Sequence, residues 1–221
     1  MALSDEDRRG RDLVVGWMKD LNLDVSIDRI GNVIGTRAGT EPGNPVLTGS
    51  HIDTVATGGR YDGNLGVLAG LEVIETLNDA KLTTRKPLSV GFFTNEEGAR
   101  FAPDMMGSGV HQGAFDLDEM LATRGIDNSI LGEELQRIGY AGAAEVDRFR
   151  VHCFLELHVE QDEATFAQMH DQLDQRELRG IARAMEHRLG RKAAAERDTV
   201  DAADQLVVLE DLAAVGVSAL V

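Results

Sequence analysis

One short segment of the chain, residues 47–63, gathers side chains that bind protons or metal ions beside several glycines. It reads LTGSHIDTVATGGRYDG and contains one His, two Asp and four Gly. His51 and Asp53 are two positions apart, so in an extended strand their side chains lie on one face and the carboxylate can orient the imidazole. Asp62 stands in GGRYDG, where glycines let a carboxylate approach a shared centre closely. This segment therefore offers a metal ligand, a residue that orients it and a second, carboxylate ligand.

Two further segments carry side chains of the same kind. Glu96 and Glu97 are adjacent in NEEG, so one can bind a metal while the other accepts a proton. His158 stands near the end of VHCFLELHVEQ and is followed by Glu160 and Gln161. Imidazole and carboxylate ligands of this kind suit Zn²⁺, and Mn²⁺ or Co²⁺ are possible alternatives. Two ions bridged by one carboxylate would acidify a water between them, and a free Glu would take its proton.

Each of these features has a plainer explanation when it is taken alone. A single His beside an Asp is more often a hydrogen-bonded pair without a metal, and adjacent Glu residues before Gly usually form a solvated loop. All of the clusters, however, stand at the ends of predicted strands. Their common placement favours one shared site over several unrelated ones.

The hydrophobic pattern around the clusters predicts alternating strands and helices. Continuous apolar runs at 45–51, 87–94 and 151–161 are typical of buried strands, and a helix over 64–79 separates the first two. Its expected apolar stripe consists of Leu65, Leu68, Leu71, Ile74 and Leu77. Such a chain predicts an α/β layered sheet with flanking helices, in which functional groups gather beyond the carboxyl ends of the strands.

Another helix is expected over residues 5–21, because Ser4 and Asp7 form the pattern of a capping box. The expected buried side of this helix consists of Leu13, Val14, Trp17, Met18 and Leu21. Short extended segments follow at 24–27 and 32–35, and two or three short helices are expected within 104–150.

The composition excludes several classes of partner. Among 221 residues, 38 are acidic and 22 basic, a net charge of −16, so nucleic acids and anionic membranes are poor partners. Only four of the basic residues are Lys, and this acid-rich, Lys-poor composition suggests adaptation to high salt. The sequence has no apolar run near the roughly 20 residues of a membrane span and no hydrophobic signal segment, so the cytoplasm is the expected location.

Three motifs together resemble the hydantoinase/carbamoylase group of amidohydrolases within the M20 metallohydrolases. They are GSHIDTVATGGRYDGNLGVLAGLEVI, GFFTNEEGARF and ELHVEQ. This group includes N-carbamoyl-L-amino-acid hydrolases, allantoate amidohydrolases and beta-ureidopropionase-like enzymes. The resemblance implies an aminopeptidase-like α/β catalytic domain with a dinuclear, usually zinc, centre, and a separate lid and dimerisation domain. It also implies a small-molecule substrate with a carbamoyl or ureido group.

The resemblance assigns a role to seven residues. Asp62 would bridge two ions, and the implied metal ligands are His51, Asp62, Glu97 and His158. Glu96 would be the general base and Asp53 the residue that orients His51. Gln161 matches a position that contacts substrate.

The chain departs from the family pattern after Gln161. Residues 1–161 are expected to form a partial catalytic domain, and 162–221 a divergent, mainly helical tail whose last segment, 201–221, is a helix or a strand. No segment resembles the lid domain, its dimer interface or the later segment that supplies a final His ligand. The second ion would then have only Asp62 and Glu97. Two hypotheses follow: an amidohydrolase, either alone or completed by another chain that supplies the remaining ligand, or a truncated and catalytically inactive relic.

Overall fold

The computed structural model describes residues 1–58, 62–146, 150–159 and 215–220. The chain divides into two compact units, of which the first comprises Met1–His158 and Ser218–Val221 and the second Val159–Val217. Of the tail 162–221, the described residues include only the strand β6 (Val215–Leu220), one of the two alternatives for the last segment. The domain boundary at 161 and the mainly helical character of the tail stay predictions.

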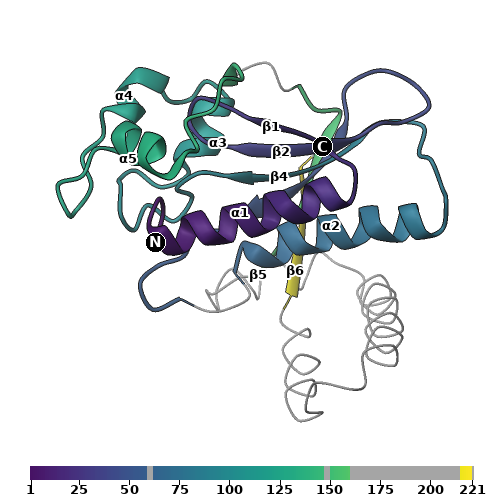
Figure 1. Ribbon diagram of the computed structural model, residues 1–221, viewed down its shortest axis with the longest axis horizontal. Helices are drawn as coiled ribbons and strands as arrows, with labels where there is room; N and C mark the ends of the chain where they lie inside the picture. The colour runs from purple at the N-terminus through teal and green to yellow at the C-terminus, as the bar shows by residue number, and fades with distance from the viewer. Residues whose placement is uncertain (59–61, 147–149, 160–214, 221) are drawn as a thin grey trace, which may run out of the picture. The chain divides into compact units, whose positions relative to one another are not determined.

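A mixed β-sheet forms the centre of the first unit (Figure 1). Its strands lie in the order β1–β2–β4–β3–β5–β6. The bounds of the first five are Asp24–Ile27 (β1), Val33–Arg37 (β2), Val46–His51 (β3), Leu88–Phe93 (β4) and Cys153–Val159 (β5). β1, β2 and β4 pair antiparallel, whereas β4, β3 and β5 pair parallel. Parallel strands connected through helices confirm the predicted α/β architecture.

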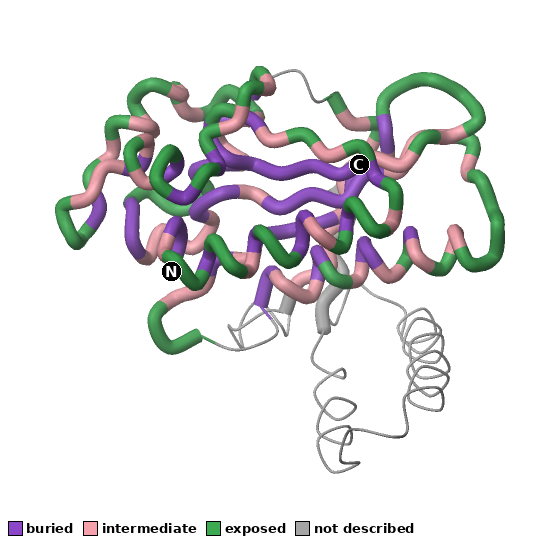
Figure 2. Tube along the Cα trace, viewed as in Figure 1, coloured by how far each residue is buried: buried purple, intermediate pink, exposed green. Residues whose placement is uncertain are grey.

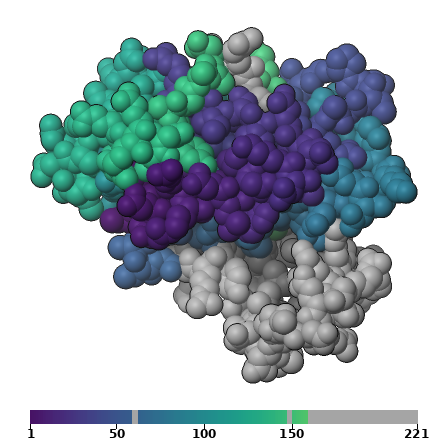
Figure 3. Space-filling view, viewed as in Figure 1, coloured from purple at the N-terminus to yellow at the C-terminus, as the bar shows by residue number. Residues whose placement is uncertain are grey.

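Two long helices, α1 (Asp5–Asp20) and α2 (Asn64–Asp79), cover one face of the sheet. Gly35 of β2 and Val90 of β4 are cross-strand partners and therefore point to the same face. A Cβ atom on Gly35 would meet Met18 of α1, and one on Gly70 of α2 would meet Val90. Figures 1 and 3 show the two helices side by side on this face. In the described ranges, no helix is long and apolar enough to cross a membrane.

Three short helices follow β4, in agreement with the prediction for 104–150. They are α3 (Met106–His111), α4 (Leu117–Leu121) and α5 (Leu131–Ile138). The end of α5 is marked by Gly139, which has a left-handed φ of 82° and so suits a residue without a side chain. α5 buries Leu131, Leu135 and Ile138 in the main hydrophobic core.

The predicted buried side of α1 is partly wrong. Val14 and Met18 are buried, but Leu13 and Trp17 are 53% and 40% exposed. Figure 2 shows buried and exposed stretches alternating along α1. The helix is rotated because two charged residues, Asp7 and Arg11, occupy the buried side together with the aliphatic residues. The prediction considered only apolar positions and therefore placed the centre of the buried face of α1 incorrectly.

The predicted apolar stripe of α2 is also partly wrong, because glycines make its closest contacts with the sheet. Leu68 is 45% exposed, whereas Gly66 and Gly70 are buried. A Cβ on Gly66 would lie 2.6 Å from the carbonyl oxygen of Leu157, and one on Gly70 2.7 Å from Cγ2 of Thr48. The absence of side chains at these positions lets α2 lie against β3 and β5, which brings its N-terminus to the ends of both strands.

A buried turn between β1 and β2 depends on the carboxylate of Asp28. This carboxylate accepts hydrogen bonds from the amides of Ile30 (3.1 Å) and Asn32 (2.9 Å) and from Nδ2 of Asn32 (2.9 Å). The orientation of the Asn32 amide group is fixed, because its Oδ1 accepts from the amide of Thr94 and its Nδ2 donates to the carbonyl of Gly107. Asp28→Asn would place two NH₂ groups against each other, so we expect a loss of ~1–3 kcal/mol in the free energy of unfolding.

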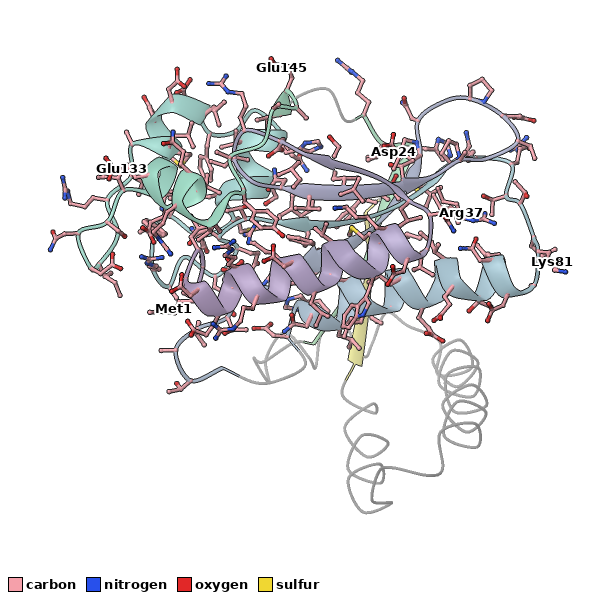
Figure 4. The ribbon with its side chains drawn as sticks, in the orientation of Figure 1. Met1, Asp24, Arg37, Lys81, Glu133 and Glu145 are labelled. Atoms are coloured by element: carbon pink, nitrogen blue, oxygen red, sulfur yellow. The ribbon has the colours of Figure 1, made fainter. Side chains whose placement is uncertain are left out.

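Urea unfolding at pH 8 measures this loss. At that pH the carboxylate is ionised, because burial raises the pKa of Asp28 only to about 6. The matched control is Asp24→Asn on the exposed side of β1 (labelled in Figure 4), for which we expect a change within about 0.5 kcal/mol. Equal unfolding midpoints for the two variants would contradict this role of Asp28.

Candidate metal centre

Two histidines meet where the parallel strands β3 and β5 end. The strands are paired from Val46 with Cys153 to Thr48 with Leu155, so His51 and His158 reach the same edge of the sheet. Their Nε2 atoms are 3.2 Å apart, and their ring centroids are 5.5 Å apart. Two predicted ligands separated by more than one hundred positions in the sequence therefore lie next to each other.

Asp62, just before α2, completes a group of three ligand atoms. Its Oδ1 lies 3.8 Å from Nε2 of His51 and 3.5 Å from Nε2 of His158. The three atoms all lie within 4.8 Å of one another, and both Asp62 and His51 are almost fully buried. Such a group of imidazole and carboxylate ligands can hold a divalent cation.

The other nitrogen of His51 determines which atom faces this centre. Nδ1 lies 2.9 Å from the main-chain carbonyl oxygen of Asp53. Since a carbonyl only accepts hydrogen bonds, Nδ1 is the donor, and the lone pair of Nε2 in the neutral form of this ring would face Asp62 and His158. This is the tautomer that a metal ligand requires.

The orienting role expected for the Asp53 side chain stays a prediction. In the structure, the hydrogen bond to Nδ1 of His51 is made by the main-chain carbonyl of Asp53. Its buried carboxylate accepts instead from the amides of Glu96 (3.2 Å) and Glu97 (3.3 Å). Burial raises the pKa of Asp53, and the nearby His51 opposes this change. Asp53 thus connects the end of β3 to the NEEG turn that follows β4.

The two adjacent glutamates approach the centre from this turn. Oε2 of Glu96 lies 3.1 Å from Nε2 of His51. Burial raises the pKa of Glu96, and burial together with the neighbouring carboxylate of Asp62 raises the pKa of Glu97 to about 7. Glu96 therefore lies beside His51, whereas Glu97 has Asp62 as its carboxylate neighbour.

A cation fits the charge and the unmet hydrogen-bonding capacity of this centre. Atoms from His51, Asp62, His158 and Glu96 direct lone pairs toward one another and repel unless protons or a cation lie between them. Oδ2 of Asp62 and Oε1 of Glu97 are buried without a hydrogen-bond partner in the part of the chain that the structure describes. Buried carboxylate oxygens of this kind are costly unless a cation or a proton satisfies them.

One contact beside the centre was not predicted from the sequence. The hydroxyl of Ser50 donates to Oε1 of Glu156, which joins β3 and β5 beyond their last paired residues. Glu156 precedes His158 by two positions, so a polar residue on the same face of the strand was the available signal. The predicted substrate contact, Gln161, lies outside the described residues.

Gly63 leaves the space that the His51 ring occupies. A Cβ atom at this position would overlap the imidazole, although the φ and ψ of −49° and −25° suit any residue. We therefore expect Gly63→Ala to displace His51 and to weaken Co²⁺ binding at least about 10-fold, measured by calorimetric titration.

The matched control for Gly63→Ala is Gly16→Ala in α1, where an added Cβ meets nothing within 4 Å. This second change should leave Co²⁺ affinity unaltered and stabilise the helix by ~0.5–1 kcal/mol. Unaltered Co²⁺ affinity in Gly63→Ala would show that His51 does not contribute to binding as described.

The sequence model of peptidase family M20/M25/M40 matches residues 47–207 of the chain, a range that includes His51, Asp62, Glu97 and His158. The chain belongs to this family. The match continues past Gln161, into the segment that the sequence motifs left unassigned.

Relatives of this M20 chain include amidohydrolases. An N-carbamoyl-L-amino-acid amidohydrolase of Rhizobium meliloti is 44% identical over 161 residues, which cover 72% of this chain and 39% of the relative. An allantoate amidohydrolase of Bacillus subtilis is 34% identical over 147 residues, or 65% of this chain and 36% of the relative. The M20 chain thus spans about two fifths of the length of these relatives.

Solved structures give the same result for the fold. The crystal structure of a hydantoinase/carbamoylase family amidase from Burkholderia multivorans is 48% identical in sequence, with a TM-score of 0.73. The similarity covers 76% of this M20 chain and 41% of the amidase. It confirms that the described α/β unit is part of a hydantoinase/carbamoylase fold.

Proposed function

We propose that this chain takes part in metal-dependent hydrolysis of a C–N bond in small linear amides with a carbamoyl or ureido group. The observation that carries this proposal is the convergence of one ligand atom each from His51, His158 and Asp62 within 4.8 Å of one another. The names of the relatives supply the substrate class.

In this proposal the ligands of one cation are His51, His158 and Asp62. The second oxygen of Asp62 and the carboxylate of Glu97 would hold another cation, so Asp62 serves as the bridge. The donor set of nitrogen and oxygen suits Zn²⁺, with Mn²⁺ or Co²⁺ as alternatives. Divalent cations bound there would polarise the substrate carbonyl and acidify water.

Glu96 is the proposed general base. Its position 3.1 Å from Nε2 of His51 places it at the centre, and its side chain remains 29% exposed, so a water molecule can reach it. Burial raises the pKa of this carboxyl toward neutral pH, which favours proton transfer in both directions. Hydrolysis adds the water oxygen to the carbonyl carbon, and Glu96 transfers the water proton to the nitrogen as the C–N bond breaks.

The substrate contacts beyond the metal centre are proposed from the family resemblance. Gln161 would contact the substrate, and the cytoplasm remains the proposed location. Nucleic acid and membranes are not proposed as partners, because the net charge of −16 repels phosphate groups.

A second candidate function is supported by the number of ligands. Among the residues that the structure describes, the second cation would have only Asp62 and Glu97, fewer than the four ligands typical of zinc. We therefore infer, as the alternative, that the chain is one part of a split enzyme and that another chain supplies the missing ligand. An inactive relic would bind at most one ion.

Counting bound metal and assaying hydrolysis together test these alternatives. The purified chain is loaded with Zn²⁺ or Mn²⁺, and ammonia release is measured with N-carbamoyl-amino acids and allantoate. Two ions per chain with ammonia release support the hydrolase. One ion or none without turnover supports the split enzyme if a complementing chain restores the second ion and turnover, and supports the relic if it does not.

A further inference from the structure

Beneath the NEEG turn, α1 buries a complete arginine side chain. Arg11 is fully buried, and its Nε donates to Oδ2 of Asp7 at 2.8 Å. Its guanidinium lies between the rings of Phe92 and Tyr140, with centroid distances of 5.4 and 5.3 Å. An ion pair in the core is costly to desolvate, and aliphatic side chains could fill the same space. This cost suggests a role besides stability.

The remaining donors of Arg11 reach the turn at residues 28–32 and Thr94, which follows β4 and leads into the NEEG turn. Nη1 donates to the carbonyl of Gly31 at 2.9 Å, and Nη2 donates to Oγ1 of Thr94 at 3.3 Å. Oδ1 of Asn32 joins the same turns by accepting from the amide of Thr94. The planar guanidinium therefore fixes the distance between residues 28–32 and the end of β4.

Thr94 is two residues before Glu96, and the segment between them is held on every side. Asn95 has a left-handed φ of 53°, and its Nδ2 donates to the carbonyl of Phe101 at 2.8 Å. The amides of Glu96 and Glu97 donate to Asp53. A shift of Thr94 would therefore move both glutamates relative to the histidines, because the intervening backbone has little freedom.

We propose that Arg11 is a positioning residue for Glu96 and Glu97, acting through Thr94. This inference rests on the proposed function, since the value of fixing two glutamates comes from the metal centre. Arg11 itself does not contact the centre, and its partner Asp7 fixes the guanidinium from within the same helix.

Two conservative variants of the full chain test this inference. Arg11→Lys keeps a cation beside Asp7, but one ammonium group cannot reproduce the fork to Gly31 and Thr94. Thr94→Val keeps the ion pair and removes only the hydroxyl. In both, we expect hydrogen exchange at the amides of Glu96, Glu97 and Gly98 to accelerate about 10-fold in the metal-free chain. The affinity for Co²⁺ should fall about 10–100-fold, with an altered visible absorption spectrum.

The matched control is Val14→Ala, which removes core packing one turn farther along α1. Local exchange is insensitive to global stability, so this variant should unfold more easily yet keep wild-type exchange at Glu96–Gly98 and wild-type Co²⁺ affinity. Unchanged exchange or unchanged Co²⁺ affinity in both Arg11→Lys and Thr94→Val would overturn the inference. Failure of the wild-type chain to bind Co²⁺ would instead refute the proposed function.

Discussion

Asp62→Ala should remove metal from the protein more completely than Glu97→Ala. One oxygen of Asp62 faces both histidines and the other is buried without a hydrogen-bond partner among the described residues, so the proposed bridge serves both cations. Changing a residue that merely supports a ligand lowers metal affinity about 10–100-fold. Removing a ligand that two ions share should therefore lower metal affinity by more than ~100-fold. Glu97→Ala should weaken only one of the two ions.

Titration of the metal-free variants with Co²⁺ measures this difference, with metal analysis after gel filtration as the second readout. Asp24→Ala, on the exposed side of β1, is the control for removing one negative charge, and its Co²⁺ affinity should equal that of the wild type. Equal losses in the Asp62 and Glu97 variants would argue against a bridging Asp62.

Glu96→Gln should separate hydrolysis from metal binding. The amide has the size of the carboxyl group but cannot accept and return a proton, so turnover should fall by about 10²–10⁴-fold. The bound metal should not change, because the proposed ligands are His51, Asp62, Glu97 and His158. Ammonia release and metal content, measured on the same preparation, check both parts of this prediction.

The control for this change is Glu133→Gln on the exposed part of α5, labelled in Figure 4. It removes the same charge from a different element and should leave hydrolysis unaltered. Turnover retained in Glu96→Gln would exclude Glu96 as the base. If the isolated chain has no activity, the same comparison is made after the complementing chain has been added.

The alternation of strands and helices could be predicted because their patterns are local. The capping box at Ser4 marks the start of α1, where the Ser4 hydroxyl accepts from the amide of Asp7 at 3.2 Å. The predicted range of α2, 64–79, agrees with the helix from Asn64 to Asp79. Capping and periodicity involve residues within a few positions of one another, so the sequence alone displays them.

The buried faces of the helices were less predictable, because glycines and charged residues are buried there and a search for aliphatic residues does not detect them. Gly66 and Gly70 give no apolar signal, yet their lack of side chains decides which side of α2 meets the sheet. Asp7 and Arg11 share a helical face with Val14 and Met18. Their spacing of four residues was the signal that could have revealed the buried ion pair.

The candidate metal centre likewise combines features that the sequence reveals with features that only the folded chain reveals. Its candidate residues could be named from motifs, whereas the meeting of His51 and His158 depends on the pairing of β3 with β5 across about one hundred residues. The hydrogen bonds of Asp53 could not be predicted from residue type, since its main-chain carbonyl accepts from His51 and its carboxylate accepts from the amides of Glu96 and Glu97. Long-range pairing and main-chain contacts leave no local pattern.

A crystal structure of the chain soaked with Co²⁺, with anomalous diffraction recorded at the cobalt edge, tests the metal centre most directly. The predicted result is a peak bound by Nε2 of His51, Nε2 of His158 and a carboxylate oxygen of Asp62, at about 2.0–2.2 Å as for comparable ligands. The absence of an ion from this position, with cobalt bound at other sites in the same crystal, would contradict the proposed metal centre.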